Sequence, residues 1–114
     1  MELPEITDEV MRAGLAGTRP FCALILRATP KLQRPAVDPI IWEHGRRNFA
    51  LKAAGLLPIV CPVDDGSGIT GVAIFNAEAE RVREIMDGDP GVLAGIFTYE
   101  IHPTRSFPGS SLPG

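Results

Sequence analysis

The pattern of apolar and polar positions divides the chain into strands and helices. The stretch FCALILRAT, residues 21–29, is apolar on both sides of an extended chain, and TGVAIFNA, residues 70–77, repeats this pattern. We therefore expect both faces of these two strands to be covered. Two further apolar runs, residues 56–63 and 96–103, predict two more strands. The prolines in the run LLPIVCPV predict an edge position or irregular pairing.

Apolar residues at helical spacing predict two helices between these strands. The first begins at Asp38, an N-cap residue followed by proline, and ends near Ala54, where a glycine suits the C′ position. The second covers residues 78–89, and one more helical turn follows over residues 90–95. The order β-α-β-β-α-β predicts an α+β domain of the ferredoxin-like type. Two helices cover one face of such a sheet, so we expect the other face to pack against a second copy in a homodimer.

The first helix carries a histidine among its core-facing positions. At 100° per residue, His44 shares one face with Asn48 and Leu51. Such a histidine is either a buried residue that donates to a backbone carbonyl or a general base, since its pKa suits proton transfer near neutrality. Trp42 and Phe49 form a second apolar patch, and we expect them to pack in the core or against the N-terminal extension.

Composition and charge narrow the class of protein. The 114 residues form one domain with a net charge of −3 and scattered basic residues, which argues against nucleic-acid binding. No apolar run approaches the roughly 20 residues that a membrane span requires, and the acidic N-terminus lacks a signal-peptide core. We therefore expect a cytoplasmic protein. Cys22 and Cys61 are isolated and expected to be reduced, and no spacing of ligands predicts a metal site.

Two stretches resemble the YCII-related (YciI-like) family of dimeric α+β barrel proteins. The first runs from a helix histidine through an Ala-Gly pair to an acidic-glycine turn, and the second is DGDPGVLAGIFTYEIHP. The residues that carry the resemblance are His44, Ala54-Gly55, Asp64-Asp65-Gly66, Asp89-Pro90, Val92 and Ala94-Gly95. The resemblance covers residues 20–105; residues 1–19 are an N-terminal extension with a short helix, and residues 106–114 a flexible tail.

The resemblance implies a cofactor-free enzyme with a His–Asp pair in a cleft. The activity would be of the lyase, isomerase or dehalogenase type, on a small cyclic or aromatic oxygenated molecule. His44 would be the general base, oriented by Asp65 or Asp64 of the turn; which of the two is left open. The alternative is a non-catalytic module that binds a small molecule or a partner protein in the same cleft.

Three further polar residues are candidates for contacts with a substrate. Asn48 follows His44 by one helical turn, Ser67 lies in the acidic turn, and Tyr99 lies on the last strand. Each also has a structural interpretation: Asn48 can fill a polar gap, Ser67 can be a turn hydroxyl, and Tyr99 can pack in the core.

Overall fold

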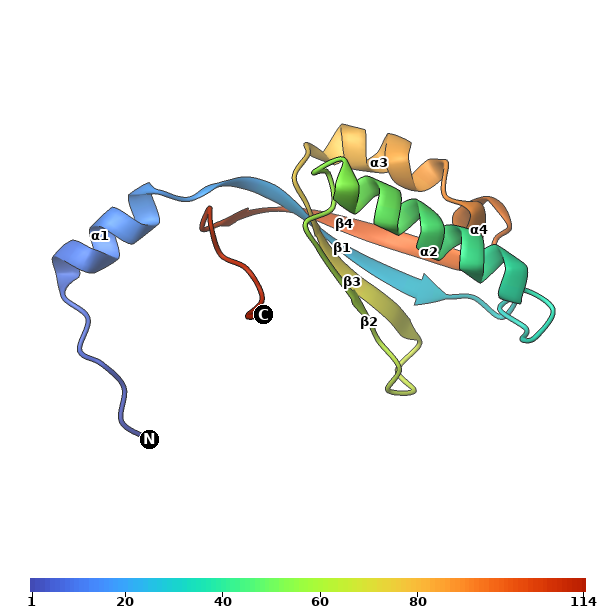
Figure 1. The fold of residues 1–114 in the computed structure, drawn as a ribbon, viewed down its shortest axis with the longest axis horizontal. Coiled ribbons are helices and arrows are strands. Elements are labelled where there is room, and N and C mark those ends of the chain that lie inside the picture. The colour runs from blue at the N-terminus through green and yellow to red at the C-terminus, as the bar shows by residue number, and fades with distance from the viewer.

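The protein is an α+β domain in which helices cover one face of a four-stranded antiparallel sheet (Figure 1). A computed structural model describes residues 1–114. The strand order is β2-β3-β1-β4. The elements are α1 (Asp8–Ala16), β1 (Arg19–Ala28), α2 (Asp38–Ala53), β2 (Ile59–Pro62), β3 (Ile69–Phe75), α3 (Ala79–Asp87), α4 (Pro90–Leu93) and β4 (Phe97–Ser106).

The predicted class and element types are confirmed, and the differences lie at element ends. Strand β2 has only four residues and lies at one edge of the sheet, because Pro58 before it and Pro62 at its end cannot donate to the ladder. Strand β4 is longer than predicted and pairs with β1 as far as Ser106 opposite Arg19. The prediction that Asp38 is the N-cap of α2 is wrong: Asp38 is the first helical residue, its carboxylate pairs with Arg34, and Val37 occupies the N-cap position without a side-chain hydrogen bond.

The core lies between the helices and the inner face of the sheet. Alternate residues of β1 and β3 point into it, and α3 supplies the facing apolar side chains, in line with the period of each element. The buried apolar residues are Cys22, Leu24, Leu26, Leu57, Ala73, Phe75, Val82, Ile85, Met86, Ile96 and Phe97. Burial raises the pKa of the Cys22 thiol, so this cysteine packs as a small apolar residue.

The outer face of the sheet has no helix over it. Ile25 of β1 lies opposite Val72 of β3, and Ala23 lies opposite Ile74, which makes an apolar area on the central strands. None of these four side chains is fully buried. No element of the same chain therefore buries this apolar face of the sheet.

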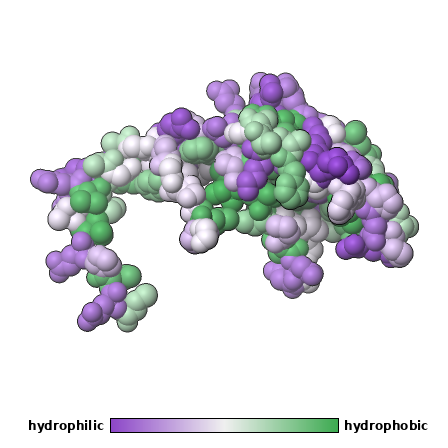
Figure 2. Space-filling model, in the orientation of Figure 1, coloured by the Kyte–Doolittle hydropathy of each residue, from purple (hydrophilic) through white to green (hydrophobic).

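The N-terminal segment extends away from the domain (Figure 1). Helix α1 has no buried residue, and apolar side chains are visible along this segment in Figure 2. The prediction that Trp42 and Phe49 pack in the core or against the extension is wrong within one chain, because these side chains are 70% and 78% exposed. No helix has both the length and the apolar character needed to cross a bilayer.

Candidate active site

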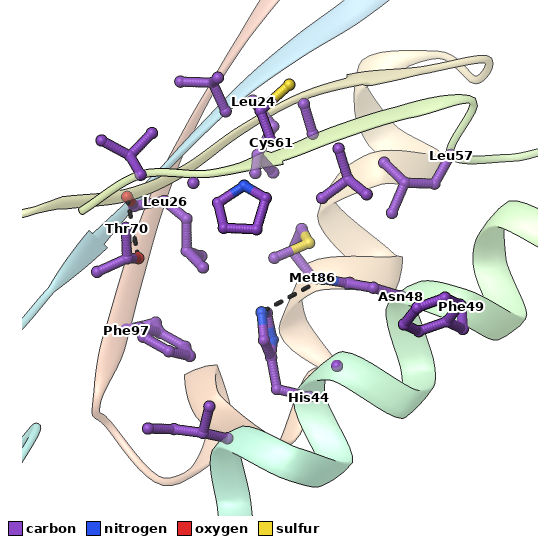
Figure 3. Close-up of a pocket in the computed structure, with 18 of the residues that line it drawn as sticks. Leu24, Leu26, His44, Asn48, Phe49, Leu57, Cys61, Thr70, Met86 and Phe97 are labelled. Carbon is purple, nitrogen blue, oxygen red and sulfur yellow. Dashed lines mark hydrogen bonds between the residues drawn. The ribbon is translucent and has the colours of Figure 1, made fainter. Parts of the chain in front are cut away.

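A cavity of about 800 Å³ separates α2 from the inner face of the sheet. Its walls are mainly apolar, and none of the 16 residues of α2 is fully buried, since the cavity lies beneath the helix. Figure 3 shows His44 pointing from α2 into this space, opposite Leu24 and Leu26 of β1. Met86 and Phe97 line the cavity from the other elements.

The imidazole of His44 is paired with a buried carboxylate. Its Nδ1 lies 2.7 Å from Oδ1 of Asp89, which is a length typical of a charge-assisted hydrogen bond. The side chains are 13% and 1% exposed, respectively, so water competes little for this contact. A carboxylate buried to this degree requires partners for its remaining lone pairs.

The backbone of α4 supplies those partners. Asp89 is the N-cap of α4, and its Oδ2 accepts hydrogen bonds from the backbone N–H of Gly91 at 2.9 Å and of Val92 at 3.2 Å. Pro90 occupies the first turn, where its missing N–H has no cost. Asp89 therefore caps the start of α4 through Oδ2 and orients His44 of α2 through Oδ1.

A glycine is required next to this carboxylate. A Cβ atom on Gly91 would lie 2.3 Å from Cδ2 of Phe97 and 3.1 Å from Oδ2 of Asp89. The Phe97 ring is itself buried and tilted against the His44 imidazole, with ring centroids 4.9 Å apart. Because Gly91 has no Cβ, the Phe97 ring can lie close to its backbone and contact the His44 imidazole.

These contacts determine which imidazole nitrogen faces the cavity as an acceptor. An ionised carboxylate only accepts, so Nδ1 of His44 carries the proton and donates to Asp89. In the neutral imidazole, Nε2 then keeps its lone pair. The only hydrogen-bond partner of Nε2 within the chain is the amide Nδ2 of Asn48, which donates over a long 3.4 Å. A weakly engaged base on the wall of an apolar cavity can accept a proton from a bound molecule.

The predicted pairing of His44 with the acidic turn is wrong. The carboxylate at His44 is Asp89, which lies 45 residues along the chain. Oδ1 of Asp65 accepts from the backbone N–H of Ser67 at 3.0 Å, and the hydrogen bonds from Ser67 lower the pKa of Asp65. Asp64 lines the cavity but makes no hydrogen bond to His44. The acidic turn is therefore held by its own backbone, as an Asx-type turn.

Of the three further candidates, the structure brings only Asn48 to the histidine. Asn48 lines the cavity one turn beyond His44. Ser67 accepts from the backbone N–H of Ile69 within the turn and does not line the cavity. The hydroxyl of Tyr99 donates to the carboxylate of Asp87, outside the cavity. Burial, and then this hydrogen bond, raises the pKa of Tyr99 to about 12.

Sequence reasoning missed Asp89, although a signal was present. An aspartate directly before proline, at the start of a helical turn, is an N-cap, and an N-cap carboxylate uses one oxygen for backbone donors. The second oxygen is then free for a partner from another element. What the sequence could not give is that α2 places His44 beside this turn.

Comparisons with protein-family profiles and with curated proteins give no significant match for this chain. No group of three or more His, Cys, Asp or Glu side chains is arranged to hold a metal ion. The site must therefore be interpreted from its own residues.

Proposed function

We propose that the chain is a small enzyme that uses His44 as a general base on a small cyclic or aromatic oxygenated molecule. The observation that carries this proposal is the 2.7 Å contact from Nδ1 of His44 to buried Asp89, with Nε2 left on the cavity side. A carboxylate that accepts from Nδ1 of a histidine fixes the tautomer of the imidazole and stabilises the imidazolium that forms during the reaction. The resemblance to YciI-like proteins supports the same proposal.

The cavity suits a ligand with an apolar body and few polar groups. A volume of about 800 Å³ lies within the range of small-molecule sites, which are mostly apolar with a few convergent polar groups. Leucines and Phe97 would contact the flat or cyclic part of the substrate. The amide of Asn48 would donate to a substrate oxygen beside the atom that loses its proton.

The proposed chemistry begins with proton transfer to Nε2. The substrate loses a proton from carbon or hydroxyl, Nε2 of His44 gains it, and Asp89 stabilises the resulting positive charge. An isomerase then returns this proton to another atom of the same molecule, whereas a lyase or dehalogenase passes it to the leaving group or to solvent. In the lyase or dehalogenase step, the electron pair freed by deprotonation forms a new π bond and the leaving group departs with its own bonding pair. In each case His44 ends neutral, and the proton is accounted for on the product, the leaving group or solvent.

We also propose that the domain is ferredoxin-like and pairs into a dimeric α+β barrel through its outer sheet face. The support is the apolar area formed by Ala23, Ile25, Val72 and Ile74, which no element of its own chain covers. Obligate interfaces of this kind bury about 2,000 Å² or more in total. A barrel of two sheets would cover both faces of β1 and β3, as their sequences require.

Hydrogen–deuterium exchange tests the base role before a natural substrate is known. A panel of cyclic ketones, γ-lactones and hydroxylated or chlorinated quinols is incubated with the protein in D₂O, and loss of C–H signals is followed by ¹H NMR. His44→Gln should slow exchange of the active compound roughly 10²- to 10⁴-fold. His102→Gln is the matched control, because this exposed histidine contacts Glu100 outside the cavity.

The same experiment separates the enzyme from the binding module. His44 resonances that shift with a compound, without any exchange or turnover across the panel, would contradict the enzyme proposal and favour the binding module. Equal exchange by wild type and His44→Gln would show that another group is the base.

A further inference from the structure

The N-terminal segment leaves a large apolar surface without a partner. Leu3, Ile6, Val10, Met11 and Leu15 are all at least half exposed. On α1 the last three lie on one side, and Asp8, Glu9 and Arg12 lie on the other, so the helix is amphipathic. A nine-residue helix is marginal in water on its own. Helix α1 therefore requires a surface on which its apolar side can pack.

The junction between α1 and β1 keeps this helix away from its own domain. The guanidinium of Arg105 on β4 donates to both the hydroxyl of Thr18, at 3.0 Å, and the carbonyl of Thr18, at 2.8 Å. The same hydroxyl donates to the carbonyl of Leu15 at the end of α1. The direction of the N-terminal segment is thus fixed by hydrogen bonds on both sides of the junction, and Figure 1 shows it pointing outward.

The overall dimensions agree with a chain that lacks part of its packing. The radius of gyration is 16.8 Å, whereas a compact chain of this length has about 13 Å. The accessible surface is 8029 Å², against about 6,100 Å² for a compact monomer of this mass. The difference exceeds the roughly 800 Å² that each partner buries in a standard interface.

A matching surface lies on the outer side of α2. Trp42 and Phe49 are two turns apart on one side of this helix, and Gly45 lies between them. Apart from its chain neighbours and the backbone of its own helix, nothing lies within 4 Å of the position that a Cβ of Gly45 would occupy. Two exposed aromatic rings therefore flank a glycine, where the backbone of α2 is accessible to a packed partner. We call Trp42, Gly45 and Phe49 the α2 stripe.

Charge favours the N-terminal segment as the occupant of the α2 stripe. Residues 1–17 contain four acidic residues and one arginine, whereas residues 18–114 contain ten acidic and ten basic residues. The excess negative charge of the chain is therefore confined to this segment. By helical position, Arg46 and Lys52 lie on either side of the α2 stripe. Arg46 is paired with Glu43 at 3.1 Å, whereas Lys52 has no acidic partner in its own chain. An acidic amphipathic helix is complementary to an aromatic stripe with an unpaired lysine at its border.

We propose that residues 1–17 of one chain pack on the α2 stripe of a second copy, in a reciprocal exchange. This proposal does not depend on the chemistry proposed for His44. It has a consequence for that site, because Gly45, Phe49 and Lys52 also line the cavity. A partner's helix on the α2 stripe would border the mouth of the cavity and help to exclude water from it.

The single tryptophan of the chain makes this exchange measurable. Trp42 emission and acrylamide quenching are recorded on the full chain from about 0.1 to about 100 µM, the range in which micromolar association appears, with sedimentation in parallel. Emission should shift to the blue and quenching should fall as dimer forms. Leu15→Gln should move this transition to roughly 10- to 100-fold higher concentration, the effect of removing one buried leucine.

A matched control lies on the polar side of the same helix. Arg12→Gln introduces the same residue as Leu15→Gln, so it should leave the transition in place or move it to lower concentration. Protection of Trp42 in a species that sediments as a monomer would mean that the chain's own segment covers the α2 stripe, and this result would overturn the proposal. A tryptophan that stays exposed at all concentrations, or a transition unaffected by Leu15→Gln, would equally overturn the proposal.

Cross-linking identifies which chain supplies the helix. Leu15→Cys and Phe49→Cys are prepared separately in a Cys61→Ser background, one with an added tag, and are mixed before mild oxidation. A covalent heterodimer that neither variant forms alone supports exchange between chains. A disulfide that forms only when both substitutions are on one chain, at low concentration, contradicts it.

Discussion

Replacing Asp89 by asparagine isolates the electrostatic part of its role. Asparagine is as good an N-cap as aspartate, so its amide oxygen can keep the hydrogen bonds from Gly91 and Val92. Its NH₂ group then faces Nδ1 of His44, and two donors cannot pair. The imidazole must therefore move its proton to Nε2 and accept at Nδ1. The nitrogen on the cavity side becomes a donor, and the base is lost without a change of shape.

The expected magnitudes follow from the contacts. Exchanging a charge-assisted hydrogen bond for a neutral one costs about 1 kcal/mol, which corresponds to a fall of roughly 4–6 °C in the melting temperature. Asp89→Ala also removes the cap and leaves donors of His44, Gly91 and Val92 without a partner, so it should cost about 2–5 kcal/mol. Activity should fall roughly 10²- to 10⁴-fold in both variants.

Nitrogen NMR of the histidine side chains gives the deciding measurement. At neutral to slightly alkaline pH, wild-type His44 should show a protonated Nδ1 and a free Nε2, and Asp89→Asn should show the reverse. The exposed His102 is an internal reference in each spectrum. Guanidinium unfolding of the three proteins supplies the stability differences. If His44 keeps its proton on Nδ1 in Asp89→Asn, the carboxylate does not set the tautomer and our reasoning about the base is refuted.

Three further predictions test the surroundings of the site. Burial chiefly raises the pKa of Tyr99 to about 12, above that of an unfolded tyrosine. The stabilising contribution of the neutral Tyr99 is therefore complete below about pH 10 and is lost as pH rises through the folded pKa. Absorbance titration at alkaline pH follows this single tyrosine, and an ordinary pKa would contradict its burial. Gly91→Ala should destabilise the fold by about 1–3 kcal/mol through its clash with Phe97, whereas Gly45→Ala, which meets open space in a helix, should stabilise it by about 0.5–1 kcal/mol in the same unfolding assay. Ile74→Glu on the outer sheet face, opposite Ala23, should move dimer formation in sedimentation to higher protein concentration with the His44 resonances unchanged, and an unchanged transition would place the interface elsewhere.

Local signals in the sequence were sufficient for the element types. Strands such as FCALILRAT and the Asp-Pro start of α2 depend on contacts within a few residues, so composition and period predict them. Element ends were less accurate. Strand β4 extends to Ser106 because β1 is long enough to pair with it, and that pairing partner is distant in sequence.

The site depends on contacts between residues far apart in the chain, which the hydrophobic period of a single helix or strand does not predict. Helical spacing placed His44 and Asn48 on an inward face, and this prediction is confirmed by the cavity that they line. The choice of a carboxylate from the acidic turn failed, because a DDG sequence satisfies its own oxygens through the turn backbone. Oδ2 of Asp89 caps α4, so Oδ1 remains available for another partner. Its contact with His44 depends on how α4 packs against α2.

The exposed residues of α2 show a different limit of sequence reasoning. Helical periodicity predicts that Trp42 and Phe49 share one face of α2, and their hydrophobicity predicts that this face is covered. Neither property predicts which chain covers it. The same holds for Ile25 and Val72 on the outer side of the sheet. Helix α2 carries both surfaces: His44 and Asn48 line the cavity, and the exposed Phe49 lies at the border between this cavity and the α2 stripe. If the partner is a second copy, then assembly and the chemistry that we propose for His44 are coupled through one helix, and a substitution in the α2 stripe should change the water content of the cavity without contacting His44.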